Sequence, residues 1–211
     1  MKSRRSRLAV AGVLALSVTV GLSAGAAQAK KKKAKIGGTV NVTKTVNAPI
    51  PDAGPTTFGV LDSTIKVGGK KFKGTKIRDV NVTVQTAGTS GASAADNLLA
   101  RLTAPNGATT QLFFALAGHS IGPVTLDDES FNFLFPTAPP APAATALVSP
   151  YQGTAQPSCF AVQFSPCVLS AMDNGGVTGT WTLSVYDFSV NETSNLVSWQ
   201  LVVAAGKPYK T

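Results

Sequence analysis

Large apolar residues alternate with small or polar residues in many segments of this chain. The two clearest segments lie near its end, and their apolar positions are Trp181, Leu183 and Val185 in the first and Val197, Trp199, Leu201 and Val203 in the second. A period of two residues predicts β-strands that bury one face. Similar alternation occurs in residues 39–46, 63–67, 77–86, 97–102 and 111–116. No segment has sustained helical periodicity, so the pattern predicts an all-β fold.

The segments between these strands carry turn and loop residues. Gly68 to Lys71 and the run Pro105-Asn106-Gly107 predict turns that join successive strands. Residues 188–195 are polar and predict a hairpin-like loop between the last two strands. Residues 137–150 are rich in Pro and Ala and lack alternation. Because proline donates no ladder hydrogen bond, a long surface loop is predicted there.

Six short motifs follow one another along residues 45–203. They are Ile50-Pro51-Asp52 and the segments 63–67, 77–84, 97–107, 126–129 and 179–203. Their residues and order resemble the P domain, also called the P/Homo B domain, which follows the catalytic domain of kexin- and furin-like proprotein convertases. Residues 86–97 and 191–195 depart from the family pattern. Recognition is expected at the divergent edge of residues 86–97 and in the loops of residues 137–167.

The resemblance implies a single domain with a jelly-roll-like antiparallel β-sandwich fold over residues 45–204, followed by a tail of residues 205–211. In the family, this domain packs beside a subtilisin-like catalytic domain and supports its folding and activity. The resemblance therefore implies a non-catalytic binding or stabilising module with a protein partner, such as a separate subtilisin-like protease. Two alternatives stay open: a trans-acting subunit in serine-type proteolysis, and a cell-surface adhesion or recognition module.

The beginning of the chain has the pattern of an export signal. Four cations precede an uncharged run that ends in Ala27-Gln28-Ala29. Residues 1–29 are therefore predicted to be a secretory signal peptide, cleaved between Ala29 and Lys30 by either the Sec or the twin-arginine route. The alternative is a membrane anchor, since the uncharged run is long enough to span a bilayer. Cleavage at this point would leave no stable membrane span. The protein is therefore predicted to be secreted or associated with the cell wall.

The net charge of +9 comes from this signal and the lysine-rich segment that follows it. The remaining residues 36–211 hold ten cations and ten anions. Residues 30–44 are predicted to be a basic, disordered tail that leads into the first strand. This tail either is simply solvated or attaches the protein to an anionic cell-surface polymer. The rest of the chain has no basic and aromatic platform of the kind that binds nucleic acid.

Cys159 and Cys167 are the only two cysteines. In an exported protein such a pair predicts a disulfide, which stabilises a short loop by about 2.5 kcal/mol on chain-entropy grounds. The alternative is a metal site with two thiolate ligands. Structural zinc needs four ligands, and His119 is the single histidine of the chain, so the disulfide is the favoured prediction.

One short motif has the residues of a protease nucleophile. Gly88-Thr89-Ser90 matches the G-T-S that precedes the nucleophile of subtilisin-like proteases. A serine nucleophile needs a histidine base and an oriented helix start behind it, whereas Ser90 lies in a loop of small residues and only His119 offers a base. The sequence therefore predicts no catalytic residues and no enzymatic activity.

An acidic cluster is the candidate site for calcium. Asp127, Asp128 and Glu129, together with Asp96, are candidate calcium ligands, because calcium prefers carboxylate and carbonyl oxygens. The alternative is that the aspartates cap a turn by accepting hydrogen bonds from backbone amides. No other cofactor is predicted. Trp181 and Trp199 are predicted to lie in the core, because both stand within the alternating apolar pattern.

Overall fold

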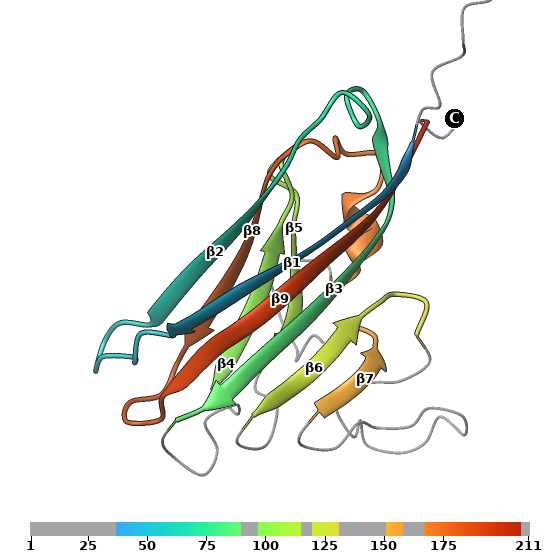
Figure 1. Ribbon diagram of the computed structural model, residues 1–211. Coiled ribbons are helices and arrows are strands. Elements are labelled where there is room, and N and C mark those ends of the chain that lie inside the picture. Colours follow the sequence, from blue (N-terminus) through green and yellow to red (C-terminus); the bar gives the residue numbers. More distant parts are fainter. Residues whose placement is uncertain (1–36, 90–96, 115–119, 131–150, 158–166, 208–211) are drawn as a thin grey trace, which may run out of the picture. The chain divides into compact units, whose positions relative to one another are not determined.

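The protein folds as two packed β-sheets, which confirms the predicted all-β sandwich. The computed structural model describes residues 37–89, 97–114, 120–130, 151–157 and 167–207 (Figure 1). These residues form nine strands and one short 3-10 helix: β1 (Gly38–Pro49), β2 (Gly59–Val67), β3 (Lys76–Gly88), β4 (Leu98–Thr103), β5 (Thr109–Phe114), β6 (Ile121–Leu126), β7 (Tyr151–Ala155), η1 (Leu169–Met172), β8 (Gly179–Asp187) and β9 (Ser194–Gly206).

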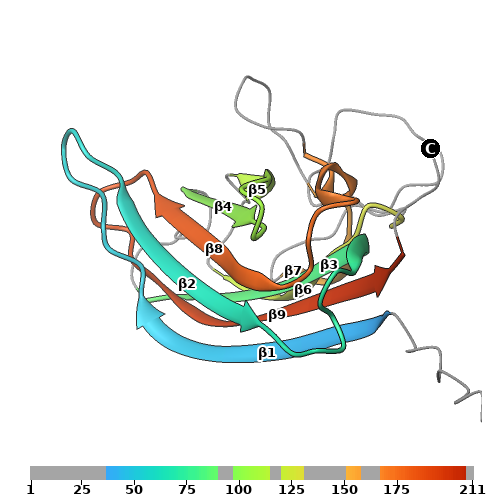
Figure 2. The same cartoon turned by 90° about the horizontal axis from the view of Figure 1, so that it is seen from above.

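The strand order is that of a jelly roll with one additional edge strand. One sheet has the order β1-β9-β3-β6-β7 and the other has the order β2-β8-β4-β5 (Figure 2). The chain moves repeatedly from one sheet to the other, so residues distant in sequence become neighbours in each sheet. All pairs within the sheets are antiparallel except β6 with β7, which is parallel. The predicted antiparallel sandwich therefore holds for every pair but this one.

The last two strands do not form the predicted hairpin. β8 pairs with β2 and β4, whereas β9 pairs with β1 and β3 in the other sheet. The polar segment between them therefore crosses from one sheet to the other. Alternation predicted the strands correctly because it reports burial of one face, but burial does not specify the partner strand.

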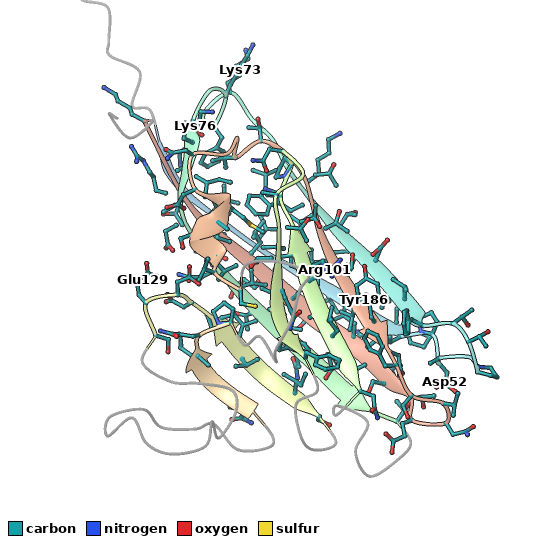
Figure 3. The ribbon with its side chains drawn as sticks, turned by 180° about the vertical axis from the view of Figure 1, so that it is seen from behind. Asp52, Lys73, Lys76, Arg101, Glu129 and Tyr186 are labelled. Carbon is teal, nitrogen blue, oxygen red and sulfur yellow. The ribbon has the colours of Figure 1, made fainter. Side chains whose placement is uncertain are left out.

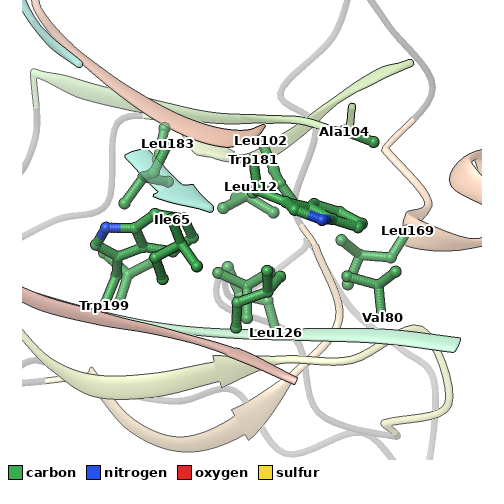
Figure 4. Close-up of a cluster of buried hydrophobic side chains, with 14 of the residues drawn as sticks. Ile65, Val80, Leu102, Ala104, Leu112, Leu126, Leu169, Trp181, Leu183 and Trp199 are labelled. Atoms are coloured by element: carbon green, nitrogen blue, oxygen red, sulfur yellow. The ribbon is translucent and has the colours of Figure 1, made fainter. Parts of the chain in front are cut away.

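The core lies between the inner faces of the two sheets (Figure 4). Trp181 on β8 and Trp199 on β9 are 0 % and 1 % exposed, so their predicted core positions are confirmed. Both indole N–H groups are paired: Trp181 donates to the Val177 carbonyl at 3.1 Å and Trp199 donates to the Ser63 hydroxyl at 2.9 Å. The second hydrogen bond joins the two sheets, because Ser63 lies on β2.

One predicted core position on β9 is wrong. Val197 is only partly buried, whereas its neighbour Leu196 is fully buried. The register on β3 passes from Gln85 opposite Ser198 directly to Thr86 opposite Leu196, so Val197 is the extra residue of a β-bulge. A bulge shifts the alternation by one residue, and a local sequence pattern cannot reveal where this happens.

The first and last strands form the two termini of the sandwich. β1 begins at Gly38 and contains the alternating segment predicted at residues 39–46, and β9 continues to Gly206. β6 and β7 were not recognised from the sequence, because β6 contains Gly122 and Pro123 and β7 contains Gly153. No helix within the described ranges is both long enough and apolar enough to cross a membrane.

Candidate binding site

A pocket of about 270 Å³ opens on the outer face of the four-stranded sheet. Its lining residues are Phe58, Leu99, Arg101, Tyr186 and Phe188. Leu99 and Arg101 lie on β4, Tyr186 lies on β8, Phe58 directly precedes β2 and Phe188 directly follows β8. Figure 3 shows Arg101 and Tyr186 close together on these two neighbouring strands. Three segments that are distant in the sequence therefore build this pocket.

Strand alternation explains why these side chains face outward. On β4, Leu98, Ala100 and Leu102 are fully buried, so Leu99 and Arg101 point to the opposite face. Leu99 stands opposite Tyr186, and Arg101 stands opposite the next outward residue of β8. Most other outward positions of this sheet hold polar or small residues, so these large side chains are unusual on its outer face.

Phe188 is the centre of an exposed aromatic cluster. Its ring centroid lies 4.5 Å from that of Phe58, with an interplanar angle of 53°. Phe114 on β5 meets Phe188 edge to face, with 5.6 Å between centroids. Phe58 is 64 % exposed and Phe188 is 37 % exposed. Exposed aromatic clusters of this kind often mark interaction sites, since burying them against a partner is favourable.

The position of Phe58 is set by a close backbone approach at Gly59. A Cβ atom at Gly59 would lie 1.6 Å from the carbonyl oxygen of Pro51, so only glycine fits where β2 begins. This contact holds the segment before β2 against the Ile50-Pro51-Asp52 motif. Phe58 is thereby carried to the rim of the pocket.

Arg101 is the only cation among the five lining residues. Its guanidinium carbon lies 5.7 Å from the centroid of the Tyr186 ring, in a cation–π contact. The Nε–H is buried and has no hydrogen-bond partner. A β-bulge on β5 adjoins this residue, because Ala100 pairs with Phe113 while Arg101 pairs with Gln111. Bulges next to binding sites commonly re-aim side chains.

A buried carboxylate lies directly behind the pocket. Asp187, the last residue of β8, is 0 % exposed. Its Oδ1 accepts a hydrogen bond of 2.9 Å from the Ser189 amide, and its Oδ2 has no partner. Burial raises the pKa of Asp187, and the charges of Asp52 and Glu192 raise it further, against the lowering effect of the Ser189 amide. This carboxylate is therefore poorly stabilised in its ionised form.

Two of the predicted calcium ligands, Asp127 and Asp128, act as hydrogen-bond acceptors for backbone amides. The two oxygens of Asp128 accept bonds of 2.8 Å and 2.7 Å from the amides of Leu169 and Ser170, at the beginning of η1. Asp127 accepts a bond of 2.9 Å from the Glu129 amide. These contacts agree with the capping alternative. Within the described ranges, no three His, Cys, Asp or Glu side chains are grouped so as to hold a metal ion.

One neighbour of this turn shows the effect of crowding carboxylates. Burial raises the pKa of Asp79 on β3, and the negative charge of Asp127 raises it further. The carboxylates of Asp79 and Asp127 therefore repel each other.

Several predicted sites lie outside the described residues. They are Ala29 and Lys30 at the cleavage point, Ser90, the calcium candidate Asp96, His119 and Cys159. Cys167 is described, but its predicted disulfide partner Cys159 is not, so this pairing stays a prediction. Recognition was predicted at the edge of residues 86–97 and in the loops of residues 137–167. Residues 90–96 of that edge and residues 137–150 and 158–166 of those loops are likewise outside the described ranges.

The alternating pattern does not single out the pocket residues, because outward positions of a half-buried strand are normally solvent-facing. Phe188 stands within residues 188–195, which are otherwise mostly polar and were predicted to be a loop. One sequence feature could have indicated the pocket: large residues stand at outward positions of half-buried strands, at Leu99, Arg101 and Tyr186. The convergence of Phe58 on this face could not be inferred without the strand order.

Comparison with known proteins gives a distant structural similarity only. No protein-family model and no curated protein matches the chain. A solved complex of the serine protease of Aeromonas sobria with a chaperone superposes with a TM-score of 0.41 and 15 % identity, over 82 % of this chain and 28 % of the other. The solved serine protease of Aeromonas sobria gives a TM-score of 0.38 and 16 % identity, over 80 % and 27 %. The chain thus spans less than a third of either solved chain, and similarity at this level carries no information on function.

Proposed function

We propose that this chain is a secreted, non-catalytic binding module that holds a partner protein at the aromatic pocket. The observation that carries the proposal is the exposed cluster of Phe58 and Phe188 over an apolar pocket. Aromatic side chains in a concave site supply most of the binding energy at many protein interfaces. The five lining residues include no serine, cysteine, histidine or carboxylate, so this pocket lacks a nucleophile and a base.

The sequence motifs support the same proposal. Their resemblance to the P domain suggests an accessory module that accompanies a subtilisin-like serine protease, so a separate protease is the first partner to test. Such a partner would make the chain a trans-acting subunit in serine-type proteolysis. The predicted export signal of residues 1–29 supports an encounter outside the cell.

Capture from culture supernatant tests the pocket as the binding site. The full chain is immobilised, and the bound proteins are quantified by mass spectrometry. Phe58→Ala and Phe188→Ala are expected to reduce capture of the main partner at least about tenfold, because truncating an aromatic anchor typically costs 2 kcal/mol or more. Phe58→Ala should keep the melting midpoint close to that of the original chain, since Phe58 is 64 % exposed. Phe188 is 37 % exposed and contacts Phe58, Phe114 and Tyr186, so the melting midpoint of Phe188→Ala is measured alongside to show that this variant is folded.

The matched control is Val168→Ala, which removes an exposed apolar side chain away from the pocket lining. It should leave capture unchanged. Equal capture by the original chain and both aromatic variants would show that partner binding does not use the pocket. Labelling of the protein by a serine-reactive fluorophosphonate would contradict the absence of catalysis.

The adhesion alternative depends on the lysine-rich tail rather than on the pocket. If the tail attaches the protein to an anionic cell-surface polymer, co-sedimentation with isolated cell walls should depend on residues 30–35 and should weaken as salt is added. Sedimentation that survives deletion of these residues but is lost in Phe58→Ala would instead identify the pocket as the polymer site.

A further inference from the structure

The pocket is matched to a single apolar group. Its volume of about 270 Å³ lies below the range of roughly 300–1,000 Å³ that is common for small-molecule pockets. Apart from the Arg101 guanidinium and the Tyr186 hydroxyl, the groups that line it are apolar. A bound sugar would bury several hydroxyl groups, and the pocket has few polar groups that could hydrogen-bond them, so sugar binding is disfavoured. One large apolar side chain fits these walls better.

Arg101 adds a specific requirement for a negative charge. Within the described residues its guanidinium makes the cation–π contact with Tyr186 and no hydrogen bond or ion pair. Asp62 stands two strands away, on the far side of Ser184, and accepts a hydrogen bond of 2.6 Å from the Ser184 hydroxyl. A guanidinium carries five N–H donors, and none of those of Arg101 is paired within the described residues, so a ligand that supplies an acceptor is favoured. The planar guanidinium is suited to a carboxylate.

The backbone around the pocket restricts how a peptide can enter. β8 is paired on both sides, with β2 and with β4, and β4 is also paired with β5. Their amide and carbonyl groups are therefore used in the ladders. An internal peptide segment would press amide groups against a surface with few free partners, whereas a chain end brings one apolar side chain and one carboxylate on the same residue.

We propose that the pocket recognises the C-terminal residue of the partner polypeptide, with its large apolar side chain in the aromatic cluster and its α-carboxylate on Arg101. This inference rests on the proposed function, since it names the part of the partner that the pocket binds. The chemistry required of the partner is a free carboxylate on a terminal Phe, Leu or similar residue.

Two synthetic hexapeptides of the same sequence test the inference. Both end in Phe, one as the free acid and one as the C-terminal amide, and binding to the full chain is measured by fluorescence anisotropy. The free acid is expected to bind about 10-fold to 100-fold more tightly, because a charge-assisted hydrogen bond to a partly buried guanidinium is lost in the amide. Arg101→Met, which keeps an apolar stem, should reduce the affinity for the free acid to that for the amide.

Lys66→Met is the matched control, because it removes another cation from the outer positions of the same sheet without touching the pocket lining. It should leave both affinities unchanged, and the melting midpoints of all variants show that they are folded. Equal affinities for the acid and the amide would overturn the carboxylate inference. Binding of neither peptide would overturn it as well.

These outcomes are separable from failure of the proposed function. If Phe58→Ala abolishes partner capture while acid and amide peptides bind alike, the pocket binds a partner but does not read a chain end. If Phe58→Ala and Phe188→Ala leave partner capture intact, the pocket function itself fails, whatever the peptides show.

Discussion

At the scale of single residues, Asp187 is the least well accommodated side chain next to the pocket. It is 0 % exposed and one of its oxygens is unpaired. Burial, followed by the charges of Asp52 and Glu192, raises its pKa above the ordinary value of 3.8. The native state therefore holds the proton more tightly than the unfolded chain. The resulting stability is fully present below pH 3.8 and is lost as pH rises through the raised native pKa.

Asp187→Asn tests this linkage. The asparagine keeps an acceptor for the Ser189 amide and carries no charge, so the free energy of unfolding should depend less on pH between about 4 and 7 than in the original chain. Urea denaturation at several pH values measures this slope. Identical slopes for Asp187→Asn and the original chain would show that another group is responsible.

At the scale of elements, the turn after β6 holds η1 against the sandwich. Asp128 accepts hydrogen bonds from the first two amides of η1, and Leu169 and Met172 of this helix are buried in the core. Asp128→Ala should lower the free energy of unfolding by about 2 kcal/mol, because two charge-assisted bonds to backbone amides are lost. Urea denaturation at pH 7 measures the change.

Asp127→Ala is the matched control for this element. The hydrogen bonds given for the Asp127 side chain go to Glu129 within its own turn, and its charge repels Asp79, so its removal should cost less than about 1 kcal/mol. If the two variants were equally stable, the contact between Asp128 and η1 would not be what holds this helix.

The last two strands show how far an element can be predicted from its sequence. Their alternation gave the strands and most of the buried positions, including Trp181 and Trp199. It did not give their partners, since β8 and β9 lie in different sheets, nor the bulge at Val197. Alternation is a local consequence of one-sided burial, whereas pairing is decided by contacts between distant segments.

At the scale of the whole molecule, calcium binding would show as a change in the stability of the full chain. Asp128 already uses both oxygens on backbone amides, and calcium needs six to eight oxygen ligands. We expect the melting midpoint of the full chain to be the same in calcium and in excess EDTA. A ligand that binds only the native state raises the midpoint with concentration. A midpoint that rises with calcium and falls with EDTA would restore Asp127, Asp128 and Glu129, with Asp96, as ligands.

The pocket is likewise a property of the whole molecule, because residues from several strands together form it. Leu99, Arg101 and Tyr186 are outward residues of two paired strands, and their size could have been noticed in the sequence. Phe58 joins them only because β2 pairs with the other side of β8. The unpaired state of Arg101 likewise depends on which side chains surround it in the folded protein.

The period of two residues along half-buried strands was enough to predict the all-β class, most of the strands and the burial of both tryptophans, and the resemblance to the P domain implied a jelly-roll-like sandwich. The additional parallel edge strand β7, the bulges, the amide contacts of Asp128 and the assembly of the aromatic pocket became visible only in the folded structure. The physical reason is that these features depend on which strands hydrogen-bond across the sheets, and that choice minimises the free energy of the whole chain rather than of any one segment.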